Sequence, residues 1–328
     1  MTVRAGGPPV PAAENTRARH TPVPVFLAPK DYVRSKAALV EHYSPVAAEA
    51  YTRWLATHHY ENFHVVSFLL PKRLHQDFYN VYSYCRWADD LGDELGDTQE
   101  SLRLLGWWRE QLEAMYSGEA DHPVFIALRG TVARHSIPQQ PFADLITAFE
   151  QDQVVRRYRT WEDLFGYCRN SANPVGRLVL YLCGYSDAER QRLSDATCTA
   201  LQLANFWQDV TVDLEKDRVY IPLEIMERHG YGLEDLFARR ATPAFIEVMR
   251  EICSRARELF EEGLPLVSML DRRLALDIDL FSRGGMRVLD KIAQQGYDVL
   301  ARRPAIGKVE RVRLLLASLA RVAFSRAA

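Results

Sequence analysis

The residues most able to do chemistry in this 328-residue sequence form a polar stripe inside an apolar segment. Tyr82, Arg86, Asp89 and Asp93 follow one another at steps of four, three and four residues, so all four lie on one face of a helix. A helix that is apolar on its other faces is buried, and burying carboxylates is costly unless cations hold them. The stripe therefore indicates a site for a cation.

The same pattern recurs at Gln202, Asn205, Asp209 and Asp213, flanked by Leu, Ala, Phe, Trp and Val. One Asp-x-x-x-Asp pair is usually a solvated helix face, but two such pairs inside apolar segments favour a metal site. Facing each other across a bundle, the two helices would present four carboxylates to a shared space. Such oxygen ligands suit Mg²⁺, which takes one or two carboxylates and leaves room for water and phosphate.

A diphosphate ester is the substrate that this arrangement favours. Bound metal ions turn the diphosphate into a leaving group, because they neutralise the charge that grows as the carbon–oxygen bond breaks. Arg218 follows Asp213 by five residues. Its guanidinium could reach the same phosphate oxygens, since arginine binds phosphate with two parallel donors.

Helices must position these residues, and the whole sequence predicts an all-α fold. Apolar residues recur at three- and four-residue spacing in segments bounded by Pro and Gly, and strand-like alternation is absent. Pro174 should break one expected helix, and Gly284-Gly285 in another suggests close approach by a helix or a ligand, with simple helix packing favoured. The expected helices cover residues 45–59, 73–95, 99–116, 121–135, 141–151, 161–183, 187–214, 242–263, 271–301 and 306–326.

Composition sets the remaining boundaries. Residues 1–29 are rich in Pro, Ala and Thr and are predicted to be a flexible tail, so residues 30–328 form one catalytic domain. The 41 basic residues are cancelled by 43 acidic ones, which argues against nucleic-acid binding. Five scattered cysteines without a CxxC pair are typical of a reducing cytoplasm. We expect neither a secretory signal nor a membrane-spanning segment.

Taken together, the motifs resemble those of the squalene/phytoene synthase family of head-to-head prenyl transferases. The resemblance is carried by YxxxRxxDDxxD at 82–93, QxxNxxxDxxxD at 202–213 and the following DRVYIP, and it extends from about Tyr60 to Arg302. It implies an isoprenoid synthase fold, a single helical bundle around a central cavity with two facing aspartate-rich helices. It also implies ionisation of a prenyl diphosphate with two or three Mg²⁺ ions.

The resemblance also assigns roles to individual residues. Metal binding falls on Asp89, Asp93, Asp209 and Asp213, which with Tyr167 are the predicted catalytic residues. Adding candidates from the cavity wall and from the departures described next, the predicted substrate-binding residues are Asn62, Phe63, Tyr82, Arg86, Gln202, Asn205, Gln208, Arg218, Tyr220 and Arg302.

Three departures from the family pattern narrow the expected reaction. The segment Tyr60-Glu-Asn-Phe63 replaces the serine-rich segment of many relatives, and Gln208 replaces an arginine that faces phosphate. Gly285 stands where an aromatic is common, which predicts a wider or more mobile cavity wall. Together, ENF at 61–63, NSANPVGR at 170–177 and NFWQD at 205–209 are similar to the hydroxysqualene synthase branch, associated with bacterial hopanoid precursors. Tyr60, Asn62 or Asn173 could position the reacting water.

The implied reaction converts presqualene diphosphate and water to hydroxysqualene and diphosphate. The alternative is condensation of two farnesyl diphosphates to presqualene diphosphate or squalene. No NADPH is expected, although the missing GxGxxG fingerprint is only weak evidence, because a helical synthase could bind the cofactor without it. Functional coupling to a presqualene diphosphate synthase and to a hydroxysqualene reductase would follow.

Two other classes of protein fit the sequence less well, and one segment allows two placements. Glu61 and His64 match the ExxH of di-iron bundles, but such bundles need that motif twice. A non-catalytic scaffold leaves two matched aspartate stripes unexplained. The basic, leucine-rich segment 306–326 fits either docking on the bundle, which we favour, or peripheral contact with the inner face of the plasma membrane.

Overall fold

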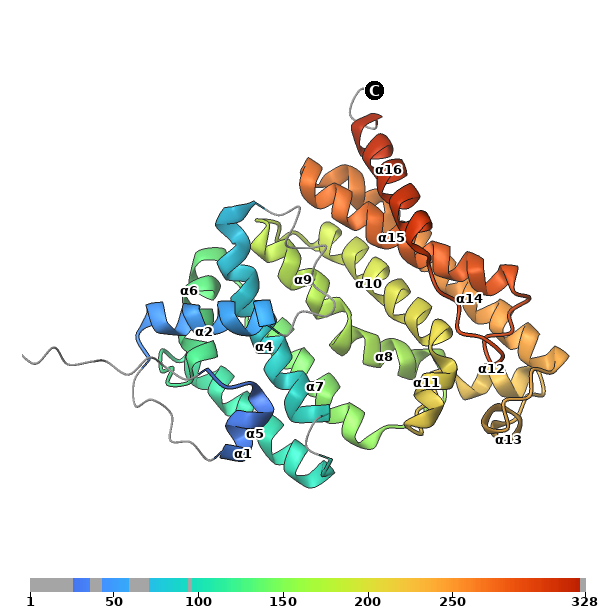
Figure 1. Cartoon of the computed structure of the whole chain (residues 1–328), viewed down its shortest axis with the longest axis horizontal. Helices are drawn as coiled ribbons and strands as arrows, with labels where there is room; N and C mark the ends of the chain where they lie inside the picture. The colour runs from blue at the N-terminus through green and yellow to red at the C-terminus, as the bar shows by residue number, and fades with distance from the viewer. Residues whose placement is uncertain (1–25, 36–42, 59–70, 94–95, 325–328) are drawn as a thin grey trace, which may run out of the picture.

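The computed structural model describes residues 26–35, 43–58, 71–93 and 96–324 of the chain (Figure 1). Within these ranges the protein is helical throughout, and its one β-bridge pairs Arg157 with Val219. The predicted all-α class is confirmed. The α-helices are α1 Pro29–Ser35, α2 Pro45–His58, α4 His75–Asp93, α5 Thr98–Tyr116, α6 Pro123–His135, α7 Gln140–Val154, α8 Trp161–Ser171, α9 Asn173–Leu182, α10 Ala188–Gln208, α11 Val210–Glu215, α12 Leu223–Arg228, α13 Leu233–Phe237, α14 Pro243–Gly263, α15 Arg272–Gln294 and α16 Lys308–Phe324.

The ends of the helices follow local chemistry, and they correct two predicted ranges. Pro174 separates α8 from α9, as expected. The range 187–214 was predicted as one helix, but it breaks at Asp209, where α10 gives way to α11. The helix predicted over residues 271–301 ends earlier than expected, because Gly296 and Tyr297 adopt left-handed backbone conformations with φ of 71° and 64°. The short helices α1, α12 and α13 were not predicted.

The N-terminal helices close around an aromatic core. Trp87 and Trp108 stack with ring centroids 5.2 Å apart, and His122 meets both rings edge-on. Tyr84 packs against Trp108 and donates a hydrogen bond to the carbonyl of Phe142 at 2.8 Å. This core fixes α4, the helix that carries the first aspartate motif, against α5, α6 and α7.

The second core is built around α10, which carries the start of the second motif. Figure 1 shows α10 running through the middle of this half of the molecule, between α9 and α14, and it packs on both. The approach of α9 is close, since a Cβ at Gly176 would overlap Ser194 Oγ and Cys198 Sγ. Trp207, Phe245 and other buried side chains fill the remaining space.

The glycine pair of α15 has the explanation that the sequence favoured, helix packing. A Cβ at Gly285 would overlap the ring of Phe260 on α14 and lie 3.1 Å from Leu201 Cδ2 on α10, whereas a Cβ at Gly284 would meet no atom within 4 Å. The expectation that Gly285 leaves a wider cavity wall is wrong, because Phe260 fills the space beside it.

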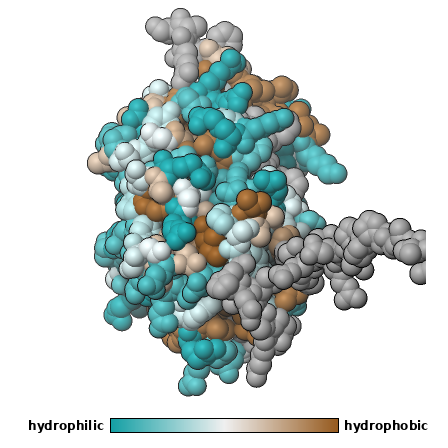
Figure 2. All heavy atoms as spheres, turned by 90° about the vertical axis from the view of Figure 1, so that its left-hand side faces the viewer, coloured by the Kyte–Doolittle hydropathy of each residue, from teal (hydrophilic) through white to brown (hydrophobic). Residues whose placement is uncertain are grey.

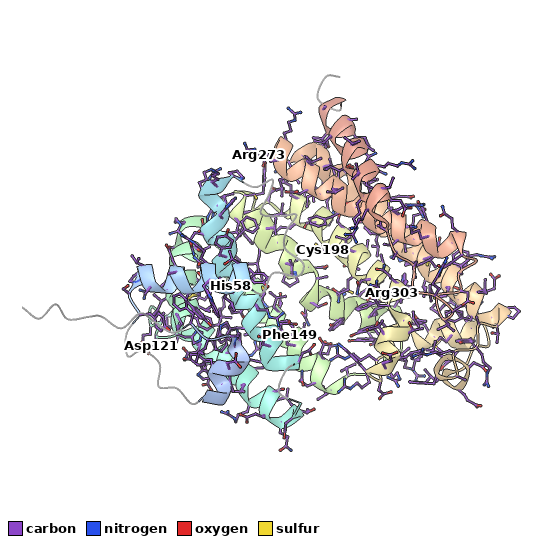
Figure 3. The ribbon with its side chains drawn as sticks, viewed as in Figure 1. His58, Asp121, Phe149, Cys198, Arg273 and Arg303 are labelled. Carbon is purple, nitrogen blue, oxygen red and sulfur yellow. The ribbon has the colours of Figure 1, made fainter. Side chains whose placement is uncertain are left out.

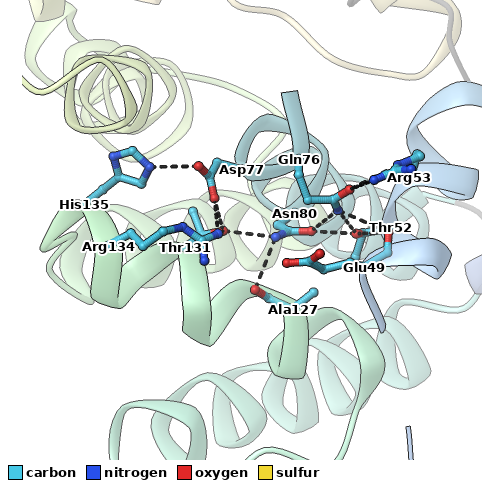
Figure 4. Close-up of polar contacts among 10 residues, drawn as sticks. All are labelled: Glu49, Thr52, Arg53, Gln76, Asp77, Asn80, Ala127, Thr131, Arg134 and His135. Atoms are coloured by element: carbon cyan, nitrogen blue, oxygen red, sulfur yellow. Dashed lines mark hydrogen bonds and ion pairs between the residues drawn. The ribbon is translucent and has the colours of Figure 1, made fainter. Parts of the chain in front are cut away.

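A buried polar network joins α4 to α6 (Figure 4). Asn80 Nδ2 donates to Thr131 Oγ1 at 3.0 Å, and Thr131 Oγ1 donates to Asp77 Oδ1 at 2.8 Å. Arg134 pairs with the same carboxylate, and His135 Nε2 lies 2.9 Å from Asp77 Oδ2. Each buried polar group is therefore satisfied, which is the condition for such a network to stabilise a core.

The N-terminal boundary lies earlier than predicted. Most of the expected tail, residues 1–25, lies outside the described residues. The described part of that range is packed: Phe26 contacts the rings of Tyr51 and Trp54, and Tyr51 donates a hydrogen bond to the carbonyl of Leu27 at 3.0 Å. Residues 26–28 therefore belong to the folded body.

Most of the molecular face in Figure 2 is hydrophilic, although hydrophobic side chains reach the surface in several places. None of the described helices is both long enough and apolar enough to span a bilayer.

Candidate active site

The first aspartate motif lies on the C-terminal half of α4. Asp89 and Asp93 each expose 45% of their side chains, so both can be reached from solvent. Arg86, one turn earlier, lies 3.5 Å from Asp89 and forms a close ion pair with the buried Asp90. Asp90 was not predicted as a site residue. Its contact with Arg86 holds that guanidinium beside the motif.

The second motif lies at the junction between α10 and α11. Asp209 adopts φ −106° and ψ 15° between the two helices, and its carbonyl accepts the Asp213 N–H at 3.0 Å. The two carboxylates therefore remain one turn apart despite the break. Asp213 Oδ2 is buried without a hydrogen-bond partner. Burial, followed by the neighbouring Asp209 charge, raises the pKa of Asp213 to about 7.

This carboxylate pair fits a bound cation. An orphaned buried carboxylate oxygen is costly, and a metal ion would satisfy it. No three carboxylate, His or Cys side chains of the described ranges cluster closely enough to surround one ion. The two motifs therefore form separate pairs. Mg²⁺ tolerates this arrangement, because it usually binds one or two carboxylates and completes its shell with water and phosphate oxygens.

Arg218 contacts both aspartate motifs, and a tight turn before it determines this position. Asp217 has a left-handed φ of 55°, which reverses the chain so that the Arg218 N–H donates to the carbonyl of Asp213 at 2.9 Å. The Arg218 side chain then reaches across to α4, where its Nη2 lies 3.8 Å from Asp93 Oδ1. The predicted binding of phosphate oxygens by Arg218 stays a prediction.

Asp152, on the last turn of α7, completes this part of the site. Tyr167 donates a hydrogen bond from Oη to Asp152 Oδ2 at 3.0 Å, and Arg218 Nη2 lies 3.5 Å from the Asp152 carbonyl. Burial raises the pKa of Asp152 to about 6, although Arg218 opposes the shift. The sequence offered no signal for Asp152, because it shares no helical spacing with the aspartate motifs.

Asp93, Asp152 and Arg218 line a cleft of about 270 Å³ between the end of α4, the start of α5 and the turn after α11. Three cations and three carboxylates share it, so its surface can bind an anion and a metal side by side. The lining residues are Gly92, Asp93, Gly96, Asp97, Thr98, Ser101, Asp152, Gln153, Arg156, Lys216 and Arg218.

Aromatic rings pack behind the cleft. Tyr220 stacks on Phe206 with ring centroids 3.7 Å apart, and Tyr167 lies 6.0 Å from Tyr220. Tyr158 also stacks with Tyr220, with ring centroids 5.7 Å apart. All four side chains are buried. The structure thus places Tyr167 and Tyr220 together, with Tyr167 the one that contacts the acidic groups.

A C-terminal segment contacts the second motif. Arg303, marked in Figure 3, pairs with Asp209, with its Nη2 3.2 Å from Oδ2. Arg302 is exposed, and its carbonyl accepts a hydrogen bond from Gln295. Gln208 donates to the carbonyl of Pro304 at 2.6 Å. Arg303, which was not predicted, thus contacts an aspartate of the motif, and Gln208 anchors the segment. Substrate binding by Arg302 and Gln208 stays a prediction.

The remaining predicted residues are less closely connected to the aspartates. Tyr82 lies half-buried on α4, and burial raises the pKa of its hydroxyl. Gln202 is half-buried and Asn205 exposed on α10. Asn173 is buried and accepts a hydrogen bond from Thr199 at 2.9 Å. Asn62 and Phe63 lie outside the described residues, as do Tyr60, Glu61 and His64.

A family model described as squalene/phytoene synthase matches residues 56–310. The chain belongs to this family. Among curated relatives, a hydroxysqualene synthase from Rhodopseudomonas palustris is 33% identical over 258 residues, covering 77% of this chain and 86% of that protein. A phytoene synthase from Thermus thermophilus is also 33% identical over 258 residues, covering 78% and 87%.

The chain is also similar to a solved structure. The squalene synthase HpnC from Alicyclobacillus acidocaldarius is 46% identical, with a TM-score of 0.74, covering 77% of this chain and 95% of that one. Its fold is the isoprenoid synthase fold, so the predicted architecture is confirmed together with the family. The squalene/phytoene synthase family comprises head-to-head prenyl transferases that act on prenyl diphosphates.

Proposed function

We propose that the chain converts presqualene diphosphate and water to hydroxysqualene and diphosphate, a step toward squalene and hopanoids. The observation that carries this proposal is the Asp209–Asp213 pair, in which one buried carboxylate oxygen lacks a partner. Beside this pair, Arg218 supplies a fixed positive charge. Such a site favours loss of diphosphate from an allylic or cyclopropylcarbinyl ester.

In this proposal the two aspartate pairs hold Mg²⁺ ions, with Asp89 and Asp93 on one side and Asp209 and Asp213 on the other. Bound Mg²⁺ would neutralise the charge that develops on the diphosphate as the carbon–oxygen bond breaks. Arg218 binds the same phosphate oxygens through its forked donors.

Tyr167 and Asp152 are assigned a positioning role. The hydrogen bond between them holds the phenol at the edge of the cleft, and the buried rings of Phe206 and Tyr220 shield this side from water. Aromatic faces also stabilise a nearby carbocation, by about 0.5–2 kcal/mol each. One water then adds its oxygen to the cationic carbon and releases a proton to solvent or to a nearby base.

Similarity to hydroxysqualene synthases supports this choice of reaction. The 46% identity to a squalene synthase fits either candidate. A second candidate is condensation of two farnesyl diphosphates, since a phytoene synthase is as similar in sequence as the first hydroxysqualene synthase. The two candidates share the ionisation step and differ in what captures the cation. If the first is right, a condensing synthase must supply the substrate and a reductase must consume the alcohol.

Product analysis tests the proposal. Purified protein with Mg²⁺ is offered presqualene diphosphate or farnesyl diphosphate, each with and without NADPH. We expect hydroxysqualene from presqualene diphosphate, independent of NADPH and lost with EDTA. Asp89→Ala, Asp93→Ala and Asp209→Ala should each abolish turnover and keep the helical far-UV spectrum. Turnover of farnesyl diphosphate alone would favour the condensation, and full activity in any aspartate variant would refute the metal assignment.

A further inference from the structure

The C-terminal helix α16 is held on the protein by a polar face. Glu310 pairs with two cations of α15, Arg287 at 2.6 Å and Lys291 at 2.9 Å. One end of α16 is thereby tied to α15. Near its other end, Arg321 pairs with the buried Asp279 of α15 at 2.8 Å. The helix is therefore formed and fixed in place before it meets any partner.

The opposite face of α16 is apolar and exposed. Val309, Val312, Leu316 and Leu319 follow one another at steps of three, four and three residues, which places them in one stripe. Their exposed fractions are 66%, 56%, 61% and 40%. The expectation that the leucine-rich face docks on the bundle is therefore wrong for this stripe. On α16 it is Ser318 and Val322 that are buried.

Unpaired basic residues flank this stripe. Lys308, Arg311 and Arg313 are exposed, and the described part of the chain gives none of them a carboxylate partner. Glu310 is the single acidic residue of α16, and the cations of α15 already neutralise it. The outer side of α16 thus combines an apolar centre with net positive edges.

We propose that this face of α16 docks on the surface of an anionic lipid bilayer. An apolar stripe with basic edges lets the side chains enter the boundary between headgroups and acyl chains while the cations meet lipid phosphates. A second copy of the chain is a poorer occupant, because two such faces packed together would bring like charges against each other. Figure 1 shows α16 at the outer edge of the molecule, where a flat surface can reach it.

The start of α16 lies close in sequence to the segment that contacts the second aspartate motif. Lys308 follows Pro304 by four residues, and the Pro304 carbonyl is held by Gln208, next to Asp209. The membrane-facing helix and the second aspartate motif are thus joined by a short anchored segment. The proposal itself stands on α16 alone and is independent of which prenyl diphosphate the protein uses.

Co-sedimentation of the full chain with vesicles tests the proposal. We expect the protein to bind vesicles that mix phosphatidylglycerol with phosphatidylcholine more tightly than vesicles of phosphatidylcholine alone, and to bind less as salt is raised. Leu316→Glu should weaken that binding by about tenfold, because it places a charge in the apolar stripe. The paired substitution Arg311→Gln with Arg313→Gln should remove most of the preference for anionic lipid.

Val46→Glu is the matched control. Val46 is 79% exposed on α2, so the same substitution there adds the same charge at a distant exposed site and should leave binding unchanged. Far-UV spectra and melting temperatures of all variants confirm folding. The proposal is overturned if the wild type binds neither kind of vesicle, or if Leu316→Glu and Val46→Glu bind alike. It is also overturned if the wild type is a dimer that Leu316→Glu converts to a monomer.

Discussion

Arg218 Nη2 lies 3.8 Å from Asp93 Oδ1, across more than a hundred residues of sequence. The backbone of the same arginine is bonded to Asp213. One residue thus ties the first aspartate motif to the second. Because the guanidinium is partly buried and lines the cleft, it lies where a diphosphate could bind between the two motifs.

Replacing Arg218 should therefore impair turnover more than folding. We expect Arg218→Gln to lower kcat/KM by about a hundredfold, the usual cost of losing one donor to a developing anion. Arg218→Lys keeps the positive charge but loses the forked donors. Its kcat/KM should therefore lie between those of Arg218→Gln and the wild type. Arg169→Gln is the control, since Arg169 is exposed and is not among the residues that line the cleft. Equal activities for Arg218→Gln and Arg169→Gln would contradict the role.

The carboxylate of Asp213, which lacks a partner, should lower the stability of the metal-free protein and contribute to metal binding. Asp213→Asn removes a buried charge that lacks a partner, so the metal-free protein should melt roughly 2–4 °C higher at neutral pH, as expected for a gain of about 1 kcal/mol. Mg²⁺ should then raise the melting temperature less than it does in the wild type. The measurement is thermal melting in EDTA and in Mg²⁺.

Glu215→Gln provides the control for Asp213→Asn. It changes an exposed carboxylate on the same short helix, paired at 3.1 Å with Arg239. We expect it to leave both melting temperatures nearly unchanged. A lower melting temperature for metal-free Asp213→Asn, or an undiminished response to Mg²⁺, would show that Asp213 is not a metal ligand.

The helical class and the two motifs could be predicted because they depend on local spacing. The break of the helix at Asp209 could not be predicted in this way. Gln208 and Asp209 are each hydrogen-bonded to a segment distant in sequence, which holds Arg303 and Pro304. Asp152 was missed for the same reason. Its partner Tyr167 reaches it from another helix, and no short-range pattern records that contact.

The network around Asp77 predicts a pH-dependent contribution to stability. Burial alone would raise the pKa of Asp77, but hydrogen bonds from Arg134, His135 and Thr131 outweigh burial and lower it. A carboxyl whose pKa is lowered in the folded state stabilises the protein above its ordinary pKa of 3.8, and this stabilisation is lost as the pH falls below that value.

Asp77→Asn should accordingly lower the free energy of unfolding by about 2–4 kcal/mol at neutral pH. The difference from the wild type should shrink in acid, as the wild-type carboxyl takes up its proton. Asp121→Asn, at an exposed carboxylate, serves as the control. Urea unfolding at neutral and acidic pH checks both variants. If the difference in the free energy of unfolding between Asp77→Asn and the wild type stays constant with pH, the pairing of ionised Asp77 is contradicted.

The adjacent glycines of α15 offer a paired test of helix packing. Gly285→Ala should destabilise the protein by about 1–3 kcal/mol, because its Cβ would overlap the Phe260 ring. Gly284→Ala meets no neighbour and should gain up to about 1 kcal/mol from helix propensity. Adding Phe260→Leu should recover part of the loss at Gly285. The measurement is urea unfolding. Equal changes in the free energy of unfolding for Gly285→Ala and Gly284→Ala would contradict this packing.

The most direct test of the central claim is the origin of the product's oxygen. Presqualene diphosphate is turned over with Mg²⁺ in water enriched in ¹⁸O, and the product is analysed by mass spectrometry. Capture of the carbocation by solvent predicts hydroxysqualene that carries the heavy oxygen in proportion to the enrichment. A hydrocarbon product, or an alcohol without the label, would contradict it.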